Sequence, residues 1–233
     1  MYYPRLTQPK YKLEKIINNP GDGVNTYGTP LSIKPSEARR ALNLCSRKLP
    51  ALCVRQGRAK FASAITTPNA MGERNNSNLH VQDGTVWKYW NGSAWVEVKT
   101  ELTSANGKIL DFVRGTDRNT ILMNGTDKYS WDGTTLTDLT NAPATNKLTV
   151  HKGRVYVLTG TAIKFSALNK VNDWTTANDA GSIEITAAKG QGSAITTYGG
   201  YVIVFTEYSM HQLYGTGPTN YQLVDVPGNI GCI

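Results

Sequence analysis

The stretch LTVHKGRVYVLTGTAIKFSALNKVNDW, residues 148–174, decides the fold. Lys152 and Gly153 form one tight turn in it, and residues 159–161 (Thr-Gly-Thr) form a second. Short β-branched and aromatic runs divided by such turns are typical of an antiparallel meander. The stretch therefore predicts three consecutive strands, which lie at 148–151, 154–158 and 162–167.

Three other parts of the chain repeat this plan, at 79–98, 120–139 and 201–224. Their central strands align at Lys88, Lys128, Lys164 and Gln212, which are 40, 36 and 48 residues apart. A period of about 40–50 residues with several strands per unit is typical of β-propeller blades, which stack because one blade cannot bury both of its faces. The sequence therefore predicts an all-β, β-propeller-like array of antiparallel meander blades.

The positive charge of the chain is concentrated in one segment. The net charge is +8, and residues 34–60 contain eight Lys and Arg residues against one acid, whereas 61–233 are close to neutral. This asymmetry indicates an interaction segment attached to a neutral body. The charge by itself leaves open a solvated surface, a dock for an acidic protein and a lining near DNA.

The first part of the chain differs in kind from the blades. Residues 1–30 are interrupted by Pro and Gly and predict an extended arm, 36–44 predict a short helix, and 49–55 predict a strand. We expect a basic N-terminal arm and docking segment at 1–60 and the blades at 61–233. The last residues, 227–233, suggest the start of another strand, so that further blades belong to a longer or separate chain, or this terminus swaps into a neighbouring subunit.

Segment-level features exclude some classes of protein. No run of about 18 apolar residues is present, and the N-terminus lacks the apolar core of a signal peptide, so no membrane anchor is expected. Three cysteines, an odd number, argue against a disulfide framework and favour synthesis in a reducing cytoplasm. Each cysteine is expected to pack as a small apolar side chain.

Several short motifs resemble the tail stabilisation and nozzle proteins of short-tailed bacteriophages. The opening resemblance lies in Gly-Val-Asn at 23–25, Pro30, Ile-Lys-Pro-Ser-Glu-Ala at 33–38, Leu-Asn at 42–43 and Arg-Gln-Gly at 55–57, with Ser36 where the family often has Gly. A later resemblance lies in residues 163–167, 172–174, 181–185 and 227–232. Together the likeness covers roughly 20–60 and 145–233.

The resemblance implies a structural virion protein without catalytic residues. It implies a ring, expected to contain six identical subunits, around the channel through which DNA leaves the head. The expected partners are the tail adaptor or portal and the needle or fibre proteins, with transient contact to the exiting DNA. The expected location is the virion tail, assembled in the host cytoplasm. We expect the docking side chains to be basic residues of the first segment: Arg39, Arg40, Arg47, Lys48, Arg55 and Arg58.

No pattern of titratable residues predicts catalysis, a metal site or a cofactor. His80, His151 and His211 fall in different units at no metal-ligand spacing. Asp83, Asp132 and Asp173 occupy turn positions, where Asx turns account for them.

An alternative function is carbohydrate or cell-wall binding by a β-repeat protein. Trp87, Trp90 and Trp95 lie in one aromatic hairpin and could stack on sugar rings. The competing interpretation, which we favour, is that alternate aromatic residues fill the space between blades, because an alternating strand buries one face.

Overall fold

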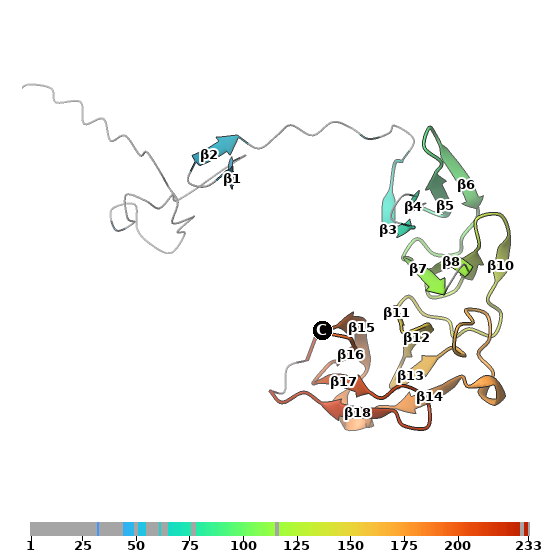
Figure 1. Cartoon of the computed structure of the whole chain (residues 1–233), viewed down its shortest axis with the longest axis vertical. Coiled ribbons are helices and arrows are strands. Elements are labelled where there is room, and N and C mark those ends of the chain that lie inside the picture. The colour runs from blue at the N-terminus through green and yellow to red at the C-terminus, as the bar shows by residue number, and fades with distance from the viewer. Residues whose placement is uncertain are drawn as a thin grey trace, which may run out of the picture. The chain divides into compact units, whose positions relative to one another are not determined.

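The computed structural model describes residues 32, 44–48, 51–54, 61, 65–75, 78–114, 117–228 and 231–232. The chain divides into two units, Met1–Phe61 and Ala62–Ile233. In the first, β1 (Leu44–Lys48) pairs antiparallel with β2 (Ala51–Val54), which confirms the strand expected at 49–55 (Figure 1). The helix expected at 36–44 lies outside the described residues except for Leu44, the first residue of β1.

The described part of the second unit contains four antiparallel sheets of four strands, each in chain order. The first sheet comprises β3 (Pro68–Arg74), β4 (Asn78–Asp83), β5 (Val86–Trp90) and β6 (Trp95–Lys99). The second comprises β7 (Lys108–Arg114), β8 (Asp117–Met123), β9 (Lys128–Trp131) and β10 (Leu136–Asp138). The third comprises β11 (Leu148–His151), β12 (Arg154–Thr159), β13 (Ala162–Phe165) and β14 (Gly181–Glu184). The fourth comprises β15 (Gly192–Tyr198), β16 (Tyr201–Thr206), β17 (Met210–Tyr214) and β18 (Gln222–Asp225).

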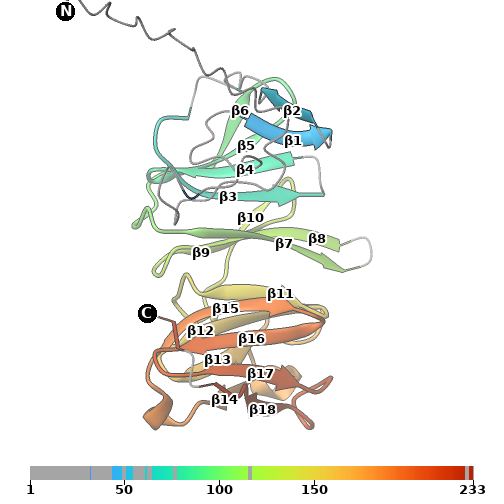
Figure 2. The ribbon, with the colours of Figure 1, turned by 90° about the vertical axis from the view of Figure 1, so that its left-hand side faces the viewer.

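The sheets are arranged as propeller-like blades. Their first strands β3, β7, β11 and β15 succeed one another along one side of the unit, and each packs beside the next (Figure 1). Figure 2 shows the first three sheets stacked face to face, with β15–β18 beside the third. The all-β, blade-like fold expected from the repeats is therefore confirmed. Two 3-10 turns, η1 (Thr176–Asn178) and η2 (Ala187–Lys189), are the helical elements described, and no described helix could cross a membrane.

Strands in the middle of the stack bury both faces. In β12, Val155 and Val157 pack toward the second sheet, whereas Tyr156 and Leu158 pack toward the fourth. All four side chains are at most 2 % exposed. Because side chains alternate across a strand, a strand between two sheets needs apolar residues at every position.

The first strands of three sheets, β3, β7 and β15, were missed by the sequence analysis, and packing explains two of them. A Cβ on Gly72 of β3 would lie 2.6 Å from the Ile109 side chain, and one on Gly192 of β15 would lie 2.5 Å from Leu158. Neighbouring sheets approach so closely here that glycine is required. Glycine weakens the strand signal in the sequence, although the tertiary structure demands it.

The three aspartates at predicted turn positions differ in the groups that their side chains bond. Asp132 accepts hydrogen bonds from the amides of Thr134 and Thr135, at 2.8 and 2.7 Å, as expected of an Asx turn. Asp173 likewise accepts from a nearby turn amide.

For Asp83 the prediction of an Asx turn is wrong, because its side chain bonds to residues far away in the sequence. Its carboxylate accepts from the amides of Thr66 and Thr67 and pairs with Lys88 at 2.8 Å. Burial alone would raise the pKa of Asp83, but Lys88 and the two amides outweigh it and hold the pKa at about 2. The carboxylate therefore ties the segment before β3 to the first sheet.

Candidate functional site

Of the basic docking residues, Arg39, Arg40, Arg55 and Arg58 lie outside the described residues. Arg47 and Lys48 belong to β1, for which the backbone is described. Their assignment as docking residues stays a prediction.

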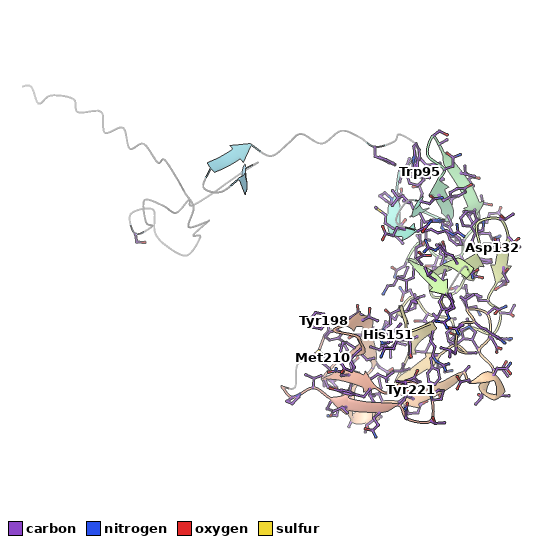
Figure 3. All side chains as sticks on the ribbon, viewed as in Figure 1. Trp95, Asp132, His151, Tyr198, Met210 and Tyr221 are labelled. Carbon is purple, nitrogen blue, oxygen red and sulfur yellow. The ribbon has the colours of Figure 1, made fainter. Side chains whose placement is uncertain are left out.

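The tryptophan hairpin is divided between the core and the surface. Trp87 is completely buried, and its Nε1 donates a hydrogen bond to His80 Nδ1 at 3.2 Å. It has no face to offer a sugar ring, which corrects its assignment to a glycan-stacking surface. Trp90 and Trp95 are half-buried and pack edge to face at 5.4 Å; Figure 3 labels Trp95.

Aromatic residues of this hairpin pack between two blades, as the favoured interpretation predicted. Trp87 and Tyr89 of the first sheet form one cluster with Tyr129 and Trp131 of the second. The ring centroids of Tyr89 and Trp131 lie 4.7 Å apart. The cluster is therefore part of the hydrophobic core between two sheets.

His80 is enclosed in this cluster. Its ring lies within 6 Å of three aromatic rings, with centroid distances of 5.8 Å to Trp87, 5.8 Å to Tyr89 and 5.3 Å to Trp131. Burial, and secondarily the positive charge of Arg74, lower the pKa of His80 from 6.5 to about 4. His80 is therefore neutral near pH 7 and acts as a hydrogen-bond acceptor within the core.

The other two histidines are separated from His80 and from each other. His151 ends β11 and is half-buried; burial, and then the charge of Lys152, lower its pKa. Within the described residues, no three His, Cys, Asp or Glu side chains are grouped so that they could hold a metal ion.

Ser209, His211 and Asp225 lie in a series that resembles the triad of a serine hydrolase. Ser209 Oγ lies 2.8 Å from His211 Nε2, and Asp225 Oδ1 lies 2.7 Å from His211 Nδ1. Nδ1 nevertheless makes no hydrogen bond of acceptable geometry within the described residues, and Asp225 also pairs with Lys189 at 2.6 Å. Ser209 is 4 % exposed and shares its hydroxyl with Thr206. A nucleophile must reach its substrate, so we assign the series to holding the β16–β17 turn.

Cys232 is exposed, contrary to the expectation of burial. Its backbone amide donates to Thr206 O at 2.9 Å, at the turn after β16. The amide of Gly192, the first residue of β15, makes the matching bond to Gly160 O after β12. The backbone of Cys232 therefore occupies a position that corresponds to the start of β15 in the fourth sheet. Within the described residues, no sheet covers its side chain.

One sheet face in the second unit carries exposed aromatic side chains. In the fourth sheet, Val202, Val204 and Leu213 pack against the third sheet, and the alternate residues point away. We call this the outer face. Figure 3 labels Tyr198 and Met210 on it, and Tyr221 near the third sheet. Tyr198 is 81 % exposed and Tyr201 37 %, and the rings of Tyr201 and Tyr214 pack at 4.9 Å. The apolar and aromatic residues of the outer face are Tyr198, Tyr201, Ile203, Phe205, Met210, Tyr214 and Val224, of which Ile203 is buried. The polar residues Thr196, Gln212 and Gln222 point to the same side.

Comparisons with known proteins give distant structural similarities. No family model matches the chain, and no curated protein matches it. One similar solved structure is a protein of unknown function from Bacteroides caccae, with a TM-score of 0.39 and 9 % identity, covering 67 % of this chain and 60 % of that one. Another is a catalytically inactive virginiamycin B lyase from Staphylococcus aureus with quinupristin, with a TM-score of 0.38 and 9 % identity, covering 70 % of this chain and 71 % of that one. Similarity at this level carries no functional argument.

Proposed function

We propose that this protein is a structural component of a bacteriophage tail. Identical copies associate through their blades to form part of the nozzle channel through which DNA leaves the head. The observation that supports self-association is the outer face of the fourth sheet. The virion context rests on the resemblance of residues 20–60 and 145–233 to tail nozzle proteins.

The outer face resembles the sheet faces that are buried inside the stack. It carries tyrosine, phenylalanine and aliphatic residues, as do the buried clusters on either side of the third sheet. Tyr198, Tyr214 and Val224 are nevertheless 81, 39 and 46 % exposed. Exposed aromatic and aliphatic side chains that gather on one sheet face are typical of a protein–protein contact.

A second copy is the occupant that continues the existing packing pattern. Among the described residues, each sheet of this unit packs against the next sheet along the chain. Met71 of β3 alternates with the core residue Ala70, points away from the second sheet and is 63 % exposed. The first sheet of one copy therefore offers an apolar side chain to the fourth sheet of another. Such head-to-tail contacts generate rings when the rotation closes.

The basic segment supplies the contacts to other tail proteins in this proposal. Between residues 34 and 60 there are eight Lys and Arg residues and one Glu. This charge suits acidic surfaces of the adaptor or portal and of needle or fibre proteins, and it suits transient contact with DNA phosphates.

Self-association is tested by the mass of the purified chain in solution. We expect an oligomer of the wild type and a monomer of the double variant Tyr201→Glu/Tyr214→Glu, because two carboxylates would be buried unpaired in the contact. Tyr208→Glu is the matched control, since Tyr208 is 62 % exposed but lies in the β16–β17 turn. A double variant of unchanged mass with an intact thermal transition would contradict the proposed contact.

The tail assignment is tested in virions. Purified particles are expected to contain the chain as a stoichiometric ring at the tail. Changing Arg39, Arg40, Arg47 and Lys48 together to Glu is expected to yield particles without complete tails. Absence of the chain from the particles would refute the tail assignment, and full tails in the quadruple variant would refute the docking role.

A further inference from the structure

A cavity of about 590 Å³ opens where parts of three sheets meet. Arg74, at the end of β3, forms one wall; strands β8, β9 and β10 of the second sheet form another; and the loop 169–172 of the third sheet closes it. Asp132, labelled in Figure 3, belongs to its lining. A volume of this size is typical of small-molecule sites.

Half of the lining residues have uncharged polar side chains. Two buried apolar residues, Phe112 and Val171, also border the cavity. Amides and hydroxyls can donate and accept hydrogen bonds at the same site. Six such residues line the cavity: Asn119, Ser130, Thr134, Thr137, Asn169 and Asn172.

Three lining residues carry buried polar atoms that lack partners. Within the described residues, Arg74 Nε, Arg118 Nη1 and Asn169 Oδ1 are buried and make no hydrogen bond. The nearest carboxylate oxygen to Arg118 Nη1 is 3.6 Å away, on Asp111, which is too long for a good bond. Two atoms of this set are donors and one is an acceptor. These atoms expose almost no surface, so the accessible amides and hydroxyls of the lining are the groups that a ligand would meet.

The charges around the cavity balance. Arg118 lies beside Asp111, and Lys170 lies 3.5 Å from Asp173. The third cation, Arg74, lies close enough to Asp132 to contribute to its lowered pKa, after the hydrogen bonds from the turn amides. An anionic or cationic ligand would therefore meet no excess of opposite charge, and a neutral ligand fits best.

The walls are held in place without a ligand. Arg74 Nη2 donates to the backbone oxygen of Arg118 at 3.2 Å and to that of Asp132, so it links the first sheet to the second. Arg154, 2 % exposed, donates to Ser166 O at 2.8 Å and to Asp179 O at 2.6 Å, and thereby fixes both ends of the β13–β14 connection. Preorganised walls lower the entropic cost of binding.

We propose that this cavity binds a neutral saccharide. The size, the amide and hydroxyl groups of the lining and the balanced charge all suit a compact ligand rich in hydroxyl groups. The site is separate from the tryptophan hairpin and does not depend on self-association through the outer face.

The test uses the full chain on an array of neutral, sialylated and sulfated glycans, followed by calorimetric titration of the neutral glycan that binds best. Thr137→Trp places a large ring in the cavity and is expected to weaken binding at least about tenfold. Thr140→Trp, at an exposed position in the turn after β10 and outside this cavity, is the control and is expected to leave the affinity unchanged. Asn172→Ala, in the exposed loop, removes one amide and is expected to weaken binding about threefold to tenfold.

The salt dependence of the affinity distinguishes a neutral ligand from a charged one. Because the cavity is balanced in charge, the affinity is expected to change less than about twofold between roughly 0.05 and 0.5 M salt. Absence of any bound neutral glycan, retention of binding by both Thr137→Trp and Asn172→Ala, or binding confined to anionic glycans and lost in high salt would each overturn the proposal. These outcomes leave the proposed tail function untouched, because the assay needs neither assembly nor virions.

Discussion

The contact between the first and second sheets and the contact between the third and fourth sheets are both built on aromatic rings. In the first, Trp87 and Trp131 surround His80. In the second, Tyr156 and Tyr221 pack edge to face and join their hydroxyls at 2.6 Å. Each contact therefore contains one polar pair within an apolar cluster.

The difference between the two contacts is the protonation chemistry of that pair. His80 must stay neutral to accept from Trp87, and its pKa of about 4 reflects the cost of charging it in the core. Burial, and then the bond with Tyr221, raise the pKa of Tyr156, so Tyr156 stays neutral at any physiological pH. Similar aromatic packing thus makes one contact acid-sensitive and leaves the other insensitive.

The largest effect is expected from removing the indole at the first contact. Trp87→Ala should lower the free energy of unfolding by about 3–5 kcal/mol, because it deletes a completely buried ring and leaves a cavity. Chemical denaturation, followed through the unfolding transition of the second unit, measures the change in the free energy of unfolding. Trp87→Phe is the control that keeps an aromatic ring but leaves His80 without a donor. A loss below about 1 kcal/mol in Trp87→Ala would contradict the packing described.

Acid is expected to destabilise the protein through the first contact. The pKa of His80 is about 4 in the folded state against 6.5 for an ordinary histidine, so the unfolded chain binds more protons between these values. The stabilisation is therefore complete above about pH 6.5 and is lost as the pH falls toward 4. From pH 7 to 5 the His80 contribution should fall by about 2 kcal/mol.

The measurement compares denaturation curves of the wild type and His80→Gln across this range. Glutamine still offers an acceptor to Trp87 but does not titrate. The His80 contribution is the difference between the two pH dependences. Parallel curves for the two proteins would show that His80 does not carry the acid sensitivity.

A smaller effect is expected at the other aromatic contact. Tyr156→Phe removes one hydrogen bond while keeping the ring, and should cost about 1 kcal/mol. Because Tyr156 does not titrate near neutrality, this cost should be the same at pH 5 and pH 8. A cost that varies with pH would show that the two contacts do not differ as described. Denaturation curves at the two pH values provide the check.

The smallest effect is expected for a tyrosine on the outer face. Tyr198→Ser should change the stability of the monomer by less than about 0.5 kcal/mol, because the side chain is 81 % exposed. Thermal melting of dilute protein provides the measurement. A loss of stability as large as that expected for a buried tyrosine would mean that the outer face is covered in the isolated chain.

Several elements of the fold could be predicted from short patterns in the sequence. The turns at Gly84, Gly92, Gly125, Gly133 and Gly153 all have positive φ, as their Asn-Gly, Asp-Gly and Lys-Gly pairs suggest. The strands on either side of these turns follow from the same local chemistry. Lys88, Lys128, Lys164 and Gln212 each lie in the third strand of their sheet, so the prediction that they mark equivalent strands is confirmed.

The candidate sites could not be predicted in the same way. Trp87 and Trp90 belong to one strand, but the first is buried and the second is half-buried, because only one face of β5 meets the second sheet. The cavity joins Arg74, Arg118 and Asn169 across three sheets. No local spacing relates these positions.

The sequence by itself determined the strand class, the tight turns and the repeating unit, because these depend on side-chain alternation and on backbone preferences within a few residues. The tertiary structure alone decided which face of each strand is covered, where Gly72 and Gly192 permit close approach, and which polar groups line the cavity. Those outcomes depend on contacts between sheets far apart in the chain. The stretch 148–174 shows both levels: its alternation is local, but the burial of both faces of β12 required two neighbouring sheets.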